Sequence, residues 1–167
     1  MNLLMSWYAC RRHPVFLKDG AEAVNAFLAE SQFADTSVQH TLSPSASKDA
    51  GLGGRNTTSV KDCGELLSRI YKGECVSKEA SEAMLNLLLN QQVTTKIPSG
   101  ISASVEIANK TGETDTDQHD IAIVYGEKTT YILCVMSENC KSGDAVSHIR
   151  DISGIVYNYL NMRLDQD

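Results

Sequence analysis

The stretch that decides the fold of this chain is Ile107-Ala108-Asn109-Lys110-Thr111-Gly112-Glu113. An apolar, strand-like approach ends here in a Lys-Thr-Gly triplet, and a polar run continues to Asp117. Lysine, a small hydroxyl and glycine in succession suit an edge strand that presents a cation and a hydroxyl donor to a substrate carboxylate. The glycine lets a ligand approach the backbone closely. Because the triplet also occurs by chance in many proteins, its meaning depends on the sequence around it.

The surrounding sequence predicts an α+β fold in which helices flank an antiparallel sheet of at least three strands. Helices are expected from 20 to 31, from a cap at Thr58 or Ser59 to Gly73, and from 77 to 90. Strands are expected near 103–110, 118–126 and 129–137, and a tight turn joins the last two. A final helix starts at Ser142 or Gly143, with these apolar residues at helical spacing: Val146, Ile149, Ile152, Ile155, Val156, Tyr159 and Leu160.

Two nearly continuous apolar runs, 121–124 and 132–135, indicate a sheet that is covered on both faces. We expect the final helix to cross one face and the upstream helices to cover the other. We also expect the 103–110 strand to lie beside the 129–137 strand. Three side chains of the hairpin should then be largely buried, namely Tyr125, Ile132 and Leu133.

The region from Asp19 to Leu160 resembles the C-terminal half of the penicillin-recognising serine hydrolases, in particular the class A β-lactamases. The segments that carry the resemblance are 97–101, 110–112, 119–125 and 131–136, followed by the long terminal helix. The run 56–59 looks like the family's entry to the helix after the omega loop. The resemblance implies a partial β-lactamase/DD-peptidase-like fold in residues 19–167, preceded by a divergent segment at 1–18.

The resemblance also implies a binding site for a β-lactam or a peptidoglycan-like carboxylate, with Lys110, Thr111, Gly112 and Glu113 as one wall. Lys110 would supply charge and Thr111 a hydroxyl donor. The Glu113 backbone N–H occupies the place of one oxyanion-hole donor, which matters only opposite a nucleophile. The plainer interpretation is a lysine at a strand edge and an ordinary amide.

The catalytic motifs of these enzymes are S-x-x-K and S-D-N, which precede K-T-G. The only S-x-x-K match is Ser45 to Lys48, in a loop rich in Gly and Ser that would not hold a nucleophile rigidly beside its base. No S-D-N occurs, and residues 35–56 contain no glutamate to serve as the omega-loop base. We therefore expect no stable acyl-enzyme from this chain alone.

Three interpretations remain open. The chain could supply one wall of a hydrolase whose nucleophile comes from a missing segment or another chain. It could be a non-catalytic module that binds peptidoglycan or β-lactams, or a relic that keeps the fold without a ligand. In the family, further N-terminal strands extend the sheet. Because a bare apolar edge tends to pair, we expect a partner, self-association or the missing N-terminal half, or else a lower stability than the length suggests.

Composition excludes several other classes. The net charge of −6 and scattered basic residues argue against nucleic acid, and the apolar runs are too short to span a membrane. At the N-terminus the basic pair Arg11-Arg12 follows the apolar stretch, the wrong order for a signal peptide, so the location is undetermined although the family is usually exported. The five cysteines fit no zinc pattern. Asp115, Asp117 and Asp120 lack EF-hand spacing, so we expect neither metal nor cofactor.

His119 followed by Asp120 suggests an acid–base pair at first sight. Adjacent residues of a strand point to opposite faces, however, so the two side chains cannot act on one another directly. The resemblance implies instead a structural, hydrogen-bonded role for Asp120.

Overall fold

The computed structural model describes residues 14–39 and 55–162, with side chains for 20–39 and 55–161. The candidate pair Ser45 and Lys48 and the N-terminal segment up to residue 13 lie outside the described residues. The chain divides into two compact units, residues 1–63 and 64–167.

In the first unit, helix α2 (Pro14–Glu30) contains a non-helical residue, Gly20, with φ of 72°. The predicted helix from 20 to 31 is the part of α2 that follows this break. From within this helix, Asn25 binds the backbone of Val38: its amide nitrogen donates to the Val38 carbonyl and its amide oxygen accepts from the Val38 N–H, each at 2.7 Å. The buried carboxylate of Asp62 accepts from the Asp35 N–H at 2.9 Å and the Thr36 hydroxyl at 2.7 Å. These bonds fix the segment between the two helices.

Helix α3 (Val60–Lys72) starts at a serine cap, since Ser59 Oγ accepts from the Asp62 N–H at 3.1 Å. It ends at Gly73, whose φ of 76° suits glycine at a helix C-terminus. Helix α4 (Lys78–Leu89) is capped by Ser77, which accepts from the Ala80 N–H. The cap at Ser77 and the glycine stop were predicted from the sequence, and of the two expected alternatives for the first cap, Thr58 and Ser59, the structure has Ser59.

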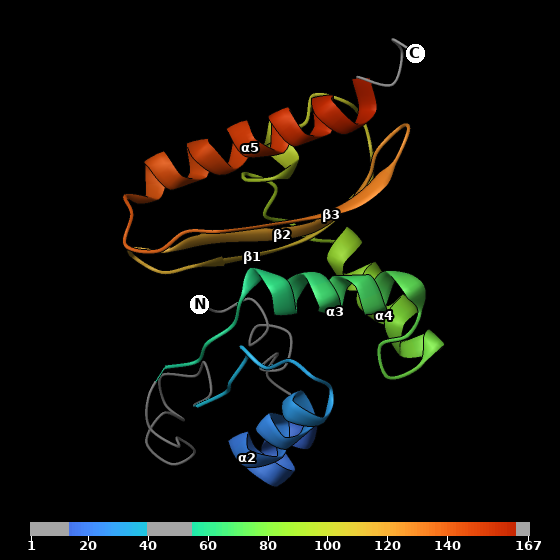
Figure 1. Ribbon diagram of the computed structural model, residues 1–167, viewed down its shortest axis with the longest axis vertical. Helices are drawn as coiled ribbons and strands as arrows, with labels where there is room; N and C mark the ends of the chain where they lie inside the picture. The colour runs from blue at the N-terminus through green and yellow to red at the C-terminus, as the bar shows by residue number, and fades with distance from the viewer. Residues whose placement is uncertain (1–13, 40–54, 163–167) are drawn as a thin grey trace. The chain divides into compact units, whose positions relative to one another are not determined.

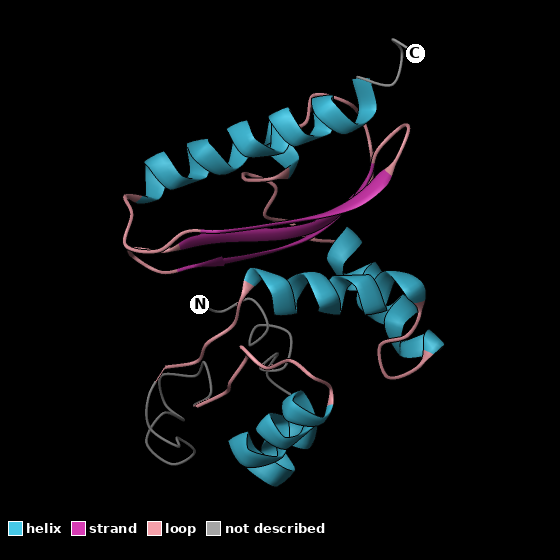
Figure 2. Cartoon of the chain, viewed as in Figure 1, coloured by secondary structure: helices cyan, strands magenta, loops and turns pink. Residues whose placement is uncertain are grey.

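The second unit is built on an antiparallel sheet of three strands, β1 (Ile107–Glu113), β2 (Gln118–Tyr125) and β3 (Thr130–Met136), in the order β1-β2-β3. Helix α5 (Ser142–Met162) crosses one face, where the short 3₁₀ helix η1 (Pro98–Gly100) also lies, and α4 lies on the other (Figures 1 and 2). On the α5 face the core joins Ile97, Ile101, Ala122, Val124, Ile149 and Tyr157. The predicted sheet, covered on both faces, is confirmed.

The central strand is β2, and this corrects the prediction that the first strand lies beside the third. Ile107 pairs with Val124 and Glu113 with Gln118, so β1 contacts β2 and not β3. The first strand also begins and ends later than the expected 103–110. Sequence periodicity identifies strands but does not by itself give their neighbours, because either hairpin partner would bury the same apolar face.

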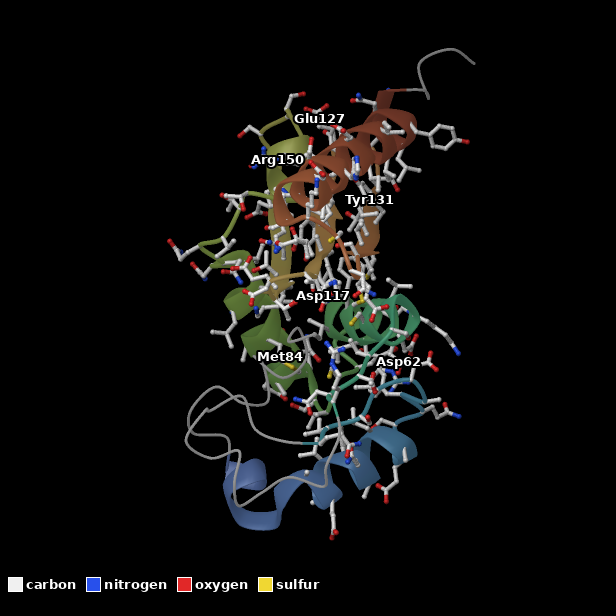
Figure 3. All side chains as sticks on the ribbon, turned by 90° about the vertical axis from the view of Figure 1, so that its left-hand side faces the viewer. Asp62, Met84, Asp117, Glu127, Tyr131 and Arg150 are labelled. Atoms are coloured by element: carbon white, nitrogen blue, oxygen red, sulfur yellow. The ribbon has the colours of Figure 1, made fainter. Side chains whose placement is uncertain are left out.

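The burial expected for three hairpin residues was too high. Tyr125, Ile132 and Leu133 are only partly buried, because β3 is an edge strand among the described residues and Tyr125 ends β2. Tyr131 on β3 packs against the α5 core (Figure 3). Its hydroxyl is buried and has no hydrogen-bond partner in the described part. Burial and the neighbouring Tyr157 raise the pKa of Tyr131 to about 12.

The inward face of α5 also differs from the predicted apolar stripe. The helix buries Ala145, Ile149, Ser153 and Tyr157, whereas Ile152, Ile155 and Tyr159 are exposed. The rotation follows from a close contact with η1, in which Ser153 Oγ donates to the Ile97 carbonyl at 2.9 Å. A small polar residue rather than a large apolar one therefore marks the buried side.

Gly100 is the tightest point of this contact, and its replacement tests the packing. A Cβ there would lie 2.9 Å from the Ser153 Cβ and closer still to the Arg150 carbonyl oxygen, which is backbone and cannot turn aside. We expect Gly100→Ala to lower the free energy of unfolding by about 2–3 kcal/mol, measured by urea denaturation. Gly143→Ala, where a Cβ meets nothing within 4 Å, is the matched control and should be neutral or stabilise by up to about 1 kcal/mol. Equal losses in both variants would contradict the close contact.

Candidate functional site

The register of the sheet sorts the site residues onto two faces. Ile107 pairs with Val124 and packs with the α5 core, so every second residue of β1 from Ile107 to Glu113 faces α5. Lys110 and Gly112 therefore face the opposite side, together with His119 on β2. Thr111 shares the α5 side with Asp120, its direct partner. The prediction that His119 and Asp120 point to opposite faces is confirmed.

The outer edge of β1 presents backbone groups at the Lys-Thr-Gly triplet. The Tyr125 N–H donates to the Glu106 carbonyl and the Thr114 N–H to the Asp117 carbonyl, both at 3.0 Å. Because hydrogen-bonded pairs alternate along an antiparallel ladder, the backbone groups of Thr111 and Glu113 point away from β2. No other strand covers this edge among residues 14–39 and 55–162. The N–H groups of Thr111 and Glu113 therefore have no strand partner among the described residues.

The ammonium group of Lys110 lies over this edge. Its Nζ donates to the Thr111 carbonyl oxygen at 2.5 Å, which uses one of its three protons. Burial lowers the pKa of Lys110, and the negative charge of Asp120 partly offsets that effect. A half-buried cation with two further protons is suited to bind an anionic group.

A second lysine, Lys96, supports the strand from the α5 side. It is 1% exposed, and its Nζ donates to the carbonyl oxygens of Gly112 at 3.3 Å and His119 at 3.1 Å. Its third contact is the Glu113 carboxylate at 3.4 Å. The three acceptors compensate the buried charge and fix the Gly112–Glu113 end of β1.

Sequence reasoning missed Lys96. Lysine is almost never fully buried, so no pattern would place this one inside. The only available signal was its position directly before the segment 97–101 that carries the family resemblance.

Asp120 is fully buried and joins the sheet to the segment before η1. Its carboxylate accepts from the Ile97 N–H at 2.9 Å and from the Asn109 side-chain amide at 3.1 Å. Burial raises the pKa of Asp120 to about 6, although the bond from Asn109 works against the rise. The structural, hydrogen-bonded role expected for Asp120 is confirmed.

The remaining candidates have local roles. Asp117 accepts from the Thr114 hydroxyl at 2.9 Å within the turn between β1 and β2. It also accepts from the Asn139 N–H at 3.2 Å, which joins this turn to the segment after β3. Cys63 and Cys75 are free, and burial raises the pKa of both thiols. Within the described part, no group of three His, Cys, Asp or Glu side chains gathers to hold a metal ion. No helix there is long and apolar enough to cross a membrane.

Comparison with known proteins finds similarity to β-lactamases and to PBP-A. A model of the beta-lactamase enzyme family matches residues 17–160. The structure of PBP-A is similar, with a TM-score of 0.71 and 24% identity over 84% of this chain and 51% of that chain. A β-lactamase from Sphaerobacter thermophilus DSM 20745 has a TM-score of 0.74 at 21% identity, over 87% of this chain and 55% of that one.

The TLA-1 extended-spectrum β-lactamase is similar too, with a TM-score of 0.74 and 20% identity over 87% of this chain and 56% of that chain. A mutant of PBP-A has been solved as an acyl-enzyme complex with penicillin G. No curated protein sequence matches the chain. The chain spans about half the length of the solved structures it resembles.

The support from Lys96 can be tested by removing its charge. We expect Lys96→Met to lower the free energy of unfolding by about 2 kcal/mol, because hydrogen bonds from a charged donor contribute about 1.5–3 kcal/mol. The matched control is Glu113→Gln, since the Glu113 side chain is 67% exposed and should change stability by less than about 0.5 kcal/mol. Urea denaturation measures both. An unchanged free energy of unfolding in Lys96→Met would show that the three acceptors need no charged donor.

Asp120 should make stability depend on pH in a defined direction. A raised pKa means that the folded state holds a proton between the unfolded value, about 3.9, and about 6. The stability that this bound proton adds grows as the pH falls from about 6 towards the unfolded-state pKa of about 3.9. It is lost as the pH rises through about 6. The free energy of unfolding of the parent chain, relative to Asp120→Asn, should therefore rise by about 1 kcal/mol from pH 7.5 to pH 5. Other titrating groups are present in both proteins and cancel, so a constant difference would contradict the raised pKa.

Proposed function

Because the chain belongs to the beta-lactamase enzyme family, we propose that β1 supplies the Lys-Thr-Gly wall of a site for a β-lactam or a D-alanyl-D-alanine-type carboxylate. The ligand would lie along the outer edge of β1. The observation that carries the proposal is the Lys110 ammonium group, held over a strand edge that no other described strand covers. The penicillin G complex of the PBP-A mutant, a protein of similar fold, supports this ligand class.

Each residue of the wall has a distinct role in this proposal. Lys110 attracts the carboxylate and donates hydrogen bonds with its remaining protons. Thr111 and Lys110 point to opposite faces, so only a ligand at the edge itself is within reach of both side chains. Gly112 adds no side chain and leaves the backbone open to the ligand. The Glu113 N–H is directed outward and can donate to an oxygen of the ligand.

We further propose that this chain binds the ligand without hydrolysing it when it acts alone. Acyl transfer needs a serine held at hydrogen-bond distance from a base, and S-D-N is missing from the sequence. The single S-x-x-K match, Ser45 to Lys48, lies in a stretch of sequence rich in Gly and Ser and outside the described residues. Hydrolysis would require a nucleophile that another segment or another chain contributes. Without ligand binding, the chain would be a relic of the fold.

Binding should depend on the charge of Lys110. We expect Lys110→Ala to weaken the binding of penicillin G and of an N-acyl-D-alanyl-D-alanine peptide by tenfold or more, because a hydrogen bond to a charged group contributes about 1.5–3 kcal/mol. Isothermal calorimetry or NMR titration measures the affinities. Lys128→Ala, an equal change of charge at an exposed residue of the β2–β3 loop, is the control and should bind like the parent.

Three results would speak against the proposal. Unchanged affinity in Lys110→Ala would exclude the lysine from the site, and no binding by the parent chain would favour the relic. Intact-mass spectrometry of the same samples checks the absence of hydrolysis. A stoichiometric penicillin adduct on one serine would show that the chain carries its own nucleophile.

A further inference from the structure

The outer edge of β3 carries backbone groups that no other described strand pairs. Just beyond the strand, the Ser137 N–H donates to the Gln118 carbonyl at 3.0 Å. Hydrogen-bonded pairs alternate along an antiparallel ladder, so every second residue back from Ser137 bonds to β2, including Leu133. Ile132 and Cys134 flank Leu133 and direct their N–H and C=O groups away from β2. The middle of β3 is therefore able to accept another strand.

The side of α5 that lies towards β3 is apolar and exposed. On its other side, Arg150 Nε donates to the Thr95 carbonyl at 2.6 Å, close to η1. The segment before η1 is bonded to Asp120 of β2, which also binds β1. Ile152 and Ile155 lie about 160° and 140° around the helix from Arg150, and so towards the β3 side. Their exposed fractions are 40% and 68%, which are high for isoleucine.

The charges that flank β3 identify a second copy of this chain as the occupant of the edge. Lys128 and Glu138, both exposed, are the first charged residues before and after the strand. They are separated by about 30 Å of extended chain, so they cannot pair with one another within one copy. In an antiparallel pair of β3 strands, each Lys128 lies beside Glu138 of the partner subunit. A parallel pair would bring like charges together, which is unfavourable.

Two-fold symmetry then sets the register of the pair. An axis through Leu133, the middle residue of β3, pairs all seven residues of both strands and places Lys128 opposite the partner's Glu138. Because Leu133 bonds to β2, the two copies of this residue form a non-hydrogen-bonded pair. Ile132 of each copy lies opposite the partner's Cys134, and the two exchange their outward backbone hydrogen bonds.

We propose that the outer edge of β3 is a homodimer interface, in which two copies pair antiparallel around Leu133 and form one continuous sheet. The axis is perpendicular to the sheet, so both α5 helices lie on the same face. Ile152 and Ile155 of the two helices extend the apolar contact over the joined strands. The pairing removes the exposed edge of β3 and leaves β1 at both outer edges. It does not depend on the ligand proposed for β1.

The charge pairs give the first test, because their variants change exposed residues and leave the fold intact. Sedimentation equilibrium of the parent chain should show a species of twice the mass of one copy. Lys128→Glu sets like charges side by side at both ends of the interface and should weaken the dimer about tenfold. Adding Glu138→Lys restores opposite charges and should return the dissociation constant to within about threefold of the parent value.

Lys78→Glu is the matched control for the change in net charge. Lys78 is an exposed residue of α4, and α4 packs against β1 at the other edge of the sheet. This variant should dimerise like the parent chain. A monomeric parent chain, or a double variant that dimerises as weakly as Lys128→Glu, would overturn the proposal.

A cysteine cross-link tests the register. Leu133→Cys places two thiols across the axis at a Cα separation of about 4.5 Å, within the range for a disulfide. Val135→Cys changes the same face of β3, but its two copies lie about 14 Å apart. After mild oxidation, non-reducing electrophoresis should show a linked dimer for Leu133→Cys. Val135→Cys should give no more than the parent chain, whose native cysteines set the background. Equal yields in the two variants would contradict the pairing around Leu133.

Discussion

The carboxylate of Asp120 joins segments that are far apart in the sequence. It lies on the central strand, accepts the Ile97 N–H and binds the side chain of Asn109 on the edge strand. The segment before η1 is thereby fixed to β1 and β2. The short helix in turn contacts α5 through Gly100 and Ser153, which sets the rotation of the long helix over the sheet. Removal of this carboxylate would leave the buried Ile97 N–H without its acceptor. A buried donor without a partner lowers stability by its full desolvation penalty.

The same arrangement positions the candidate site. Lys96 immediately precedes Ile97, and its ammonium group lies under the end of β1, where it binds two backbone carbonyls and the Glu113 carboxylate. Two lysines therefore act on one strand from opposite faces. Lys96 is buried and fixes the backbone, whereas Lys110 lies over the free edge and has protons left for a ligand. A strand fixed from one face can hold its donors in a constant position for a ligand at its outer edge.

The third strand, β3, lacks the charged side chains that β1 carries. From Thr130 to Met136 it carries no charged side chain, and most of its residues are partly exposed. Natural edge strands are usually protected by charges, proline or a covering segment. The expectation that this edge pairs with a further strand, from the same or another molecule, stays a prediction. Its basis is the lack of a charge on β3, together with the half-length match to the solved structures.

The sequence by itself determined the local features of this protein. The serine caps at Ser59 and Ser77, the stop at Gly73, the three strands and the family resemblance around Lys110 all follow from short-range patterns, because capping, turn geometry and strand alternation depend on neighbouring residues. Strand order, the inward face of α5 and the burial of Lys96 were decided only by the tertiary structure. Each depends on partners distant in the chain, such as Gly100 against Ser153 and Lys96 against Gly112. A buried lysine in particular is stable only where three acceptors converge on it, and no local pattern of residues specifies that convergence.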